Sequence, residues 1–142
     1  MLVEKVEKGT KDIVFVYTTC PSAEEARSIG LSAINEKLAV CADFWEINSI
    51  YPWQGVIQDV FQYMLMITTE KGLSDKLVKF VQGMHPYSVP MVAKTDVAFM
   101  NSTYQFWVDN VINGTGNYIS EADEKAYKRD DEGNGYHYGK LK

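Results

Sequence analysis

The feature that most constrains the fold of this chain is the stretch AVCADFWEINSIYPWQGVIQDVFQYMLMITTE, residues 39–70. It predicts two long β-strands joined at Gln54-Gly55, where the glycine supplies the positive φ of a tight turn. Each strand would run to roughly 13–14 residues, or about 45 Å at ~3.3 Å per residue. Because a domain near 100 residues has a radius of gyration of only about 13 Å, the hairpin tip must extend beyond the core of its own chain.

The segments before the hairpin predict one strand and one helix. DIVFVYTTC, residues 12–20, is rich in β-branched and aromatic residues and reads as a strand. Pro21 and Ser22 open a helix with acidic residues in its first turn, where they suit the helix dipole. Its apolar stripe at helical spacing consists of Ala26, Ile29, Ala33, Ile34 and Leu38.

After the hairpin, three further elements are expected. SDKLVKFVQGM, residues 74–84, predicts a helix with Ser74 as N-cap and with Leu77, Val78 and Val81 facing inward. MVAKTDVAF, residues 91–99, predicts a strand. STYQFWVDNVI, residues 102–112, predicts a helix capped by Ser102. The residues of this last helix that we expect to be buried, at least in part, are Phe106, Trp107 and Val111.

The order β-α-β-β-α-β-α predicts an α+β, ferredoxin-like βαββαβ sheet with an extra C-terminal helix and with the first and third strands in the centre. We expect one domain over residues 1–113, since 142 residues suffice for one core but not for two. Residues 114–142 are polar and poor in aliphatic side chains, which predicts a flexible or loosely docked tail.

The two central strands are apolar at nearly every position, as IVFVY and VFQYMLMI show. Strands with helices on one face and water on the other should instead alternate apolar and polar residues. Together with the overhanging hairpin, this pattern predicts that another copy of the same chain covers the open face of the sheet.

Charge and composition bear on partners and location. The formal charge of −5 argues against nucleic acid. An RNA-binding ferredoxin-like domain is nevertheless one alternative, because Phe15, Tyr17, Phe61 and Tyr63 alternate on the central strands, although the basic RNP1 pattern is missing. No segment approaches the ~20 apolar residues of a membrane span. The start lacks a secretory signal and two cysteines make no disulfide framework, so we expect a cytoplasmic protein.

The segment GMHPYSVP, residues 83–90, contains one of the two histidines of the chain. His85 could ligate a metal or move a proton, but it could also end a helix in a rigid turn fixed by Pro86. Cys20, at a helix N-terminus, is a candidate reactive thiol, with plain packing as the alternative. A Cys–His nucleophile pair needs an orienting partner and an oxyanion hole, and the sequence shows neither. We therefore expect no enzyme.

Four spaced motifs resemble the CutA family of divalent-cation-tolerance proteins: Pro21 at the first helix, NEKLAVC at 35–41, SIYPWQG at 49–55 and HPYSVP at 85–90, followed by a helix that carries Trp107. The resemblance runs from about residue 12 to 112. It implies a homotrimer of ferredoxin-like subunits, built like the PII signalling proteins, with sheets packed around a threefold axis and hairpins that embrace the neighbours.

The same resemblance implies a role in divalent-metal response or tolerance. The copper site proposed for some members maps onto Thr18, Met84 and His85, so that one of three ligands remains. Charged positions of the family are neutral here, including Gln54, Gln58, Gln62 and Met91.

We accordingly predict a non-enzymatic homotrimer that requires no cofactor. It binds an unidentified small molecule or protein at a ligand or interface cleft that includes Cys41, Tyr51, Trp53 and Tyr87. A copper or other divalent-metal site at His85 is the main alternative.

Overall fold

The computed structural model describes residues 12–113 and contains four strands and three helices within that range. The elements are β1 (Ile13–Cys20), α1 (Ala23–Asn35), β2 (Cys41–Trp53), β3 (Val56–Glu70), α2 (Lys71–Met84), β4 (Val92–Asp96) and α3 (Ser102–Asn113). This order confirms the α+β, ferredoxin-like arrangement with an added C-terminal helix. The predicted tail, residues 114–142, lies outside the described residues.

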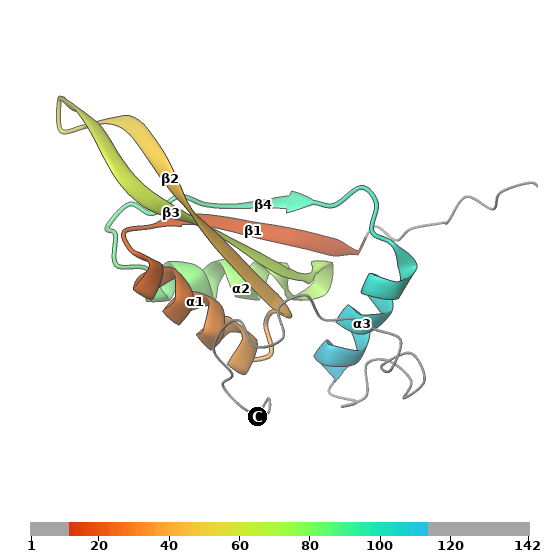
Figure 1. Ribbon diagram of the computed structural model, residues 1–142. Helices are drawn as coiled ribbons and strands as arrows, with labels where there is room; N and C mark the ends of the chain where they lie inside the picture. Colours follow the sequence, from red (N-terminus) through yellow and green to blue (C-terminus); the bar gives the residue numbers. More distant parts are fainter. Residues whose placement is uncertain (1–11, 114–142) are drawn as a thin grey trace, which may run out of the picture.

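The four strands form one antiparallel sheet in the order β2-β3-β1-β4, which confirms that β1 and β3 are central. Helices α1 and α2 lie side by side on one face of this sheet (Figure 1). Pro52 lies on β2, an edge strand, where its missing N–H costs no ladder bond on the open side.

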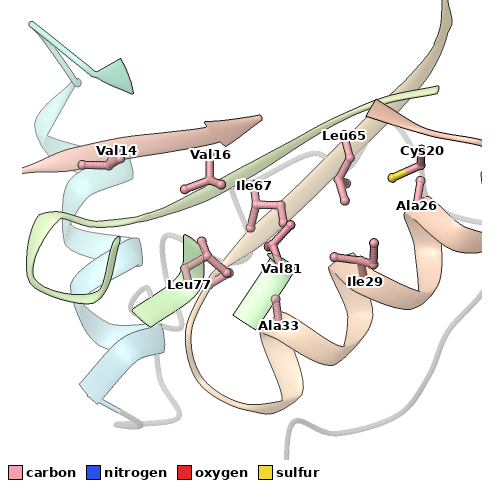
Figure 2. Close-up of a cluster of buried hydrophobic side chains, with 11 residues drawn as sticks. Val14, Val16, Cys20, Ala26, Ile29, Ala33, Leu65, Ile67, Leu77 and Val81 are labelled. Carbon is pink, nitrogen blue, oxygen red and sulfur yellow. The ribbon is translucent and has the colours of Figure 1, made fainter. Parts of the chain in front are cut away.

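The main core lies between the sheet and the two helices (Figure 2). Val14 and Val16 of β1 and Leu65 and Ile67 of β3 are fully buried against the helices. The helices contribute Ala26, Ile29, Ala33, Leu77 and Val81. Burying an aliphatic side chain of this size stabilises a fold by about 1.5–3 kcal/mol, so this cluster is what holds α1 and α2 on the sheet.

Helix boundaries agree with the sequence for α1 but not for α2. Ser22 is the N-cap of α1 and accepts a hydrogen bond from the backbone N–H of Glu25 at 3.2 Å. Ser74 was expected to cap α2, and this is wrong because the helix begins at Lys71. Ser74 lies one turn inside, is buried, and donates from Oγ to the carbonyl of Lys71 at 2.9 Å.

Helix α3 packs at the end of the sheet where β1 begins. Its buried residues are Gln105, Val108 and Val111, which are spaced at i, i+3 and i+6. Val108 and Val111 form a second cluster with Ile13 and Val40. Phe106 was expected to be buried, but it is 58% exposed within one chain because it lies about 100° around the helix from Gln105. Ser102 is the first helical residue rather than a preceding cap.

The hairpin of β2 and β3 is as long as the sequence predicts and turns at Gln54-Gly55. Both turn residues have positive φ, 49° and 80°, as a type I′ turn requires. Figure 1 shows its tip extending past the helices and past the end of β1. Large apolar side chains are therefore exposed toward the tip, namely Ile50 at 72%, Trp53 at 45%, Ile57 at 77% and Phe61 at 67%.

The face of the sheet opposite α1 and α2 carries a second set of apolar side chains. Successive residues of a strand point to opposite faces, so Tyr17 of β1 and Met64 and Met66 of β3 point away from the buried Val16, Leu65 and Ile67. Trp45 of β2 pairs with Met64 and is 45% exposed. Within one chain this face is only partly covered, as the two-sided apolar pattern predicted.

One buried hydroxyl in the core predicts a stabilising substitution. Thr18 is fully buried, and its Oγ1 has no hydrogen-bond partner among the described residues. Thr18→Val removes that polar atom without changing the branched shape, so the free energy of unfolding should rise by about 1 kcal/mol. Thr69→Val is the matched control. The Oγ1 of Thr69 donates to the carbonyl of Leu38 at 2.7 Å, so denaturant unfolding should show a lower free energy of unfolding for this variant. A lower free energy of unfolding in Thr18→Val as well would contradict this account.

The contact between β3 and α3 should make stability depend on pH. The pKa of Glu70 is raised from 4.5 to about 7 by burial, by its hydrogen bond and charge interaction with Asp109, and by the charge of Asp12. The unfolded chain therefore releases this proton at lower pH than the folded chain does, and stability should fall as pH rises from about 4.5 through about 7.

Thermal unfolding between pH 4.5 and 8 measures this effect. In Glu70→Gln, stability should decrease less between pH 4.5 and 8, because the amide keeps a hydrogen bond to Asp109 and does not ionise. Glu36→Gln, at an exposed position after α1, should leave the decrease in stability with pH unchanged. An unaltered profile in Glu70→Gln would show that other groups set the pH dependence.

Candidate functional site

A cleft of about 480 Å³ lies between the outer half of the β2–β3 hairpin and the loop that joins α2 to β4. Figure 1 shows this loop beside the hairpin, on the side of the molecule where β1 ends. Ten residues line the cleft: Thr19, Tyr51, Trp53, Gln58, Gln62, Pro86, Tyr87, Ser88, Val89 and Met91. Its volume falls in the range of small-molecule sites, about 300–1,000 Å³.

The hairpin supplies one wall through side chains that share a face of the sheet. Tyr51 and Trp53 are two residues apart on β2 and therefore point to the same side. Their cross-strand partners on β3 are Gln58 and Val56. Gln62 lies four residues further along β3, on the same face as Gln58, and is only 5% exposed.

The opposite wall is held in place by His85, which follows α2 as its C-cap residue. The imidazole Nδ1 accepts a hydrogen bond from the backbone N–H of Tyr87 at 3.1 Å. Nδ1 therefore carries no proton, and Nε2–H donates to the carbonyl of Thr19 at 2.8 Å. The ring of Tyr87 lies 4.9 Å from that of His85. Both imidazole nitrogens thus fasten the loop to the end of β1.

Tyr87 joins the two walls. Its hydroxyl donates to Oε1 of Gln62 at 2.8 Å, across a sequence separation of 25 residues. Burial raises the pKa of Tyr87, so the phenol stays protonated at neutral pH and keeps its proton for this bond. The loop, β1 and β3 are therefore linked by a continuous chain of hydrogen bonds.

The structure brings together three of the four residues predicted for the cleft. Tyr51, Trp53 and Tyr87 line it, and His85 supports it from behind. Cys41 lies at the other end of the sheet, where its side chain hydrogen-bonds with Tyr104 of α3. Ten residues of extended chain separate Cys41 from Tyr51, or roughly 33 Å. Cys41 is therefore not a cleft residue within one chain.

Neither cysteine has the environment of a reactive thiol. Cys20 is fully buried in the main core, and burial, followed by the charge of Glu25, raises its pKa to about 11. Burial and Asp43 raise the pKa of Cys41 to about 11. Both thiols are protonated at neutral pH, whereas nucleophilic and metal-binding cysteines are thiolates.

The positions of the copper site implied by resemblance do not offer a metal a free set of ligands. Thr18 is fully buried in the core of the sheet, Met84 packs partly against that core, and both nitrogens of His85 are already bonded to the backbone. Residues 12–113 contain no group of three His, Cys, Asp or Glu side chains that could hold a metal ion. These residues do not fit a copper ion.

Aromatic rings, amides, hydroxyls and apolar side chains form the surface of the cleft, and its ten lining residues include no Lys, Arg, Asp, Glu or His. Sequence comparison had drawn attention to Gln58, Gln62 and Met91 only as departures from the family's charged pattern. Thr19, Ser88 and Val89 were missed. No sequence signal marks them, because their place in the cleft depends on how the loop folds back against β1.

Comparison with known proteins gives a consistent result. The family model described as CutA1 divalent ion tolerance protein matches residues 14–111. The divalent-cation tolerance protein CutA of Thermococcus kodakarensis is 33% identical over 103 residues, which cover 72% of this chain and 99% of that protein. Mouse protein CutA is 33% identical over 71% of this chain and 58% of its own length, so the chain spans little more than half of that relative.

Solved structures show the same likeness. The crystal structure of the divalent ion tolerance protein CutA1 from Ehrlichia chaffeensis superposes with a TM-score of 0.69 at 28% identity, covering 72% of this chain and 97% of that one. Two relatives have a compartment in their names: chloroplastic for the Arabidopsis thaliana protein, 30% identical, and periplasmic for the Archaeoglobus fulgidus protein, 26% identical. None of the helices within residues 12–113 is both long and apolar enough to cross a bilayer.

The role of His85 can be tested by substitution. His85→Ala leaves the carbonyl of Thr19 and the N–H of Tyr87 without these partners, so the free energy of unfolding should fall by about 1–2 kcal/mol. His85→Asn can still accept from Tyr87, and His85→Gln can still donate to Thr19, so each should recover part of the loss in denaturant unfolding. The structural role would be contradicted if the unmodified protein bound copper stoichiometrically at sub-micromolar concentration and His85→Ala did not. His85 would then be a metal ligand.

Proposed function

This chain belongs to the CutA1 divalent ion tolerance protein family, and on that basis we propose that it acts as a non-enzymatic homotrimer in the response to divalent metal ions. Its molecular action is to bind a small molecule or a partner protein at clefts between subunits. The observation that carries the proposal is the cleft itself: two walls from distant parts of the chain, joined by the bond from Tyr87 to Gln62.

Assembly into a trimer is supported by the apolar surface that one chain leaves exposed. Trp45 and the hairpin residues Ile50, Ile57 and Phe61 are each at least 45% exposed. The strand register places Trp45 on one face of the two strands and Ile50, Ile57 and Phe61 on the other. Exposed large apolar side chains on a soluble domain mark association sites, so both faces offer contacts to neighbouring chains. Because Tyr51 and Trp53 lie on the overhanging part of the hairpin, a neighbouring chain would approach the cleft and complete its outer edge.

A binding role is favoured over catalysis by the state of the nucleophile candidates. The two thiols are protonated because burial raises their pKa values, and the imidazole uses both nitrogens to hold the backbone. An RNA-binding role is disfavoured because Phe15, one of the aromatics on β1, packs with the α3 cluster rather than standing free to stack on a base.

Two further parts of the proposal concern the chain as a whole. We place the protein in the cytoplasm, with the sequence-based reasons as support. We also assign residues 1–113 to the family domain and 114–142 to a polar C-terminal tail. The family match over residues 14–111 is consistent with the first of these ranges.

A single charge on the open sheet face should prevent assembly without unfolding the chain. Met64 points away from the helices and is half-buried within one chain. In the trimer, an aspartate at this position would be buried without a partner, at a cost of several kcal/mol. Size-exclusion chromatography with light scattering should therefore give a three-chain mass for the unmodified protein and a smaller or aggregated species for Met64→Asp.

Two controls make the result specific. Thr103→Asp adds the same charge at an exposed position in the first turn of α3 and should keep the three-chain mass. Leu65→Asp places the charge in the helix-covered core and should abolish folding altogether. If Met64→Asp kept the mass and stability of the unmodified protein, the open face would not be an interface.

A further inference from the structure

We propose that the cleft selects an uncharged, planar ring that carries an amide-type carbonyl, and that Gln62 is the residue that recognises this carbonyl. The proposal rests on the proposed function, since it takes the cleft to be a ligand site and adds the chemical class of the ligand. Four observations on the described residues lead to it.

The first observation is a buried glutamine with an uncommitted donor. Gln62 is only 5% exposed, and its Oε1 accepts from the hydroxyl of Tyr87 at 2.8 Å. That bond fixes the orientation of the amide plane and directs the Nε2 group to the side away from Tyr87. Among residues 12–113 the structure records no hydrogen bond for Nε2, and Gln62 lines the cleft. An N–H group that lines a cleft and makes no bond to the protein is a donor available to a ligand acceptor.

The second observation is the absence of charge. The ten lining residues include no Lys, Arg, Asp, Glu or His. A carboxylate or ammonium group placed there would lose part of its hydration and gain no opposite charge in return. A neutral carbonyl loses far less on entering and receives a hydrogen bond from Gln62. The walls that one chain supplies therefore favour a neutral group over a charged one.

The third observation is the shape of the walls. Tyr51 and Trp53 present aromatic rings from one strand, and Met91 adds a polarisable thioether from the far side of the loop. Aromatic rings pack on one another in offset or edge-to-face arrangements with centroids about 4.5–7 Å apart, and a thioether also packs well against a ring. A flat ring uses such walls better than a branched aliphatic group does.

The fourth observation is that the recognition group is held rigidly before any ligand arrives. His85 bonds to the end of β1 and to the backbone of Tyr87, and Tyr87 in turn holds Gln62. Little conformational freedom is left to lose on binding, which favours affinity for a small ligand. His85 and Tyr87 are positioning residues in this scheme, and Gln62 makes the contact.

The test uses two probes that differ mainly in charge, nicotinamide and nicotinate, with the full-length ¹⁵N-labelled protein. The indole N–H signal of Trp53, assigned by its loss in Trp53→Phe, reports on the cleft. Nicotinamide should shift this signal saturably with a Kd in roughly the millimolar range, as expected for so small a ligand. Nicotinate should bind at least about tenfold more weakly, because its carboxylate has no counter-charge in the cleft.

Gln62→Glu tests the recognition residue. The carboxylate can still accept from Tyr87, but it presents an acceptor and a negative charge where the amide presented a donor. Nicotinamide affinity should fall at least about tenfold, whereas Gln54→Glu, the same substitution at the exposed turn, should leave it unchanged. Tyr87→Phe removes only the hydroxyl that orients Gln62, and it should weaken nicotinamide binding even if Gln62→Glu fails to fold.

The outcomes separate the ligand class from the proposed function. The ligand class would be overturned if nicotinate bound as tightly as nicotinamide. It would also be overturned if neither Gln62→Glu nor Tyr87→Phe weakened nicotinamide binding. In both cases the cleft would remain a binding site. If neither probe nor a benzylamine control perturbed Trp53, the cleft would not be a small-molecule site. Both the ligand class and the small-molecule part of the proposed function would then fall.

Discussion

The structure depends on a sheet whose central strands are apolar on both faces. Helices α1 and α2 cover one face, and α3 covers the other only at the end where β1 begins. Val16, Leu65 and Ile67 are fully buried under α1 and α2, and Tyr17, Met64 and Met66 point the opposite way. A single chain buries the side chains under α1 and α2 but leaves those on the opposite face partly exposed to water. The same constraint continues into the hairpin, where apolar side chains lie beyond the reach of either helix. The proposed association of several chains would cover both surfaces.

The cleft follows from the same geometry. Because β2 and β3 continue past the end of β1, their inner side chains need a second wall, and the loop after α2 provides it. His85 holds that loop against Thr19, and Tyr87 reaches across to Gln62. His85, which the sequence suggested as a metal ligand or proton-transfer group, therefore has both ring nitrogens hydrogen-bonded to backbone groups. Its place in the molecule is to hold the loop rigidly beside the cleft, and in our proposal the uncharged lining of that cleft selects the ligand.

Most of the fold was predictable because local sequence patterns specify its strands, helices and turns. The long stretch of strand-type residues at 39–70 and its Gln54-Gly55 turn located β2 and β3, and the order of elements predicted the sheet. The errors arose where packing overrode local preference. Helix α2 starts directly at the end of β3, so Ser74 became an interior residue.

The site was predictable only in part. Tyr51, Trp53 and Tyr87 line the cleft of one chain. Cys41 lies at the other end of β2, so its place at a cleft between subunits stays a prediction. The bond between Tyr87 and Gln62 depends on a loop conformation that no spacing rule specifies. Native mass spectrometry of the unmodified protein at low micromolar concentration tests the central claim most directly, because it counts chains. This account predicts three chains per particle that persist on dilution. A folded, stable single chain would contradict it.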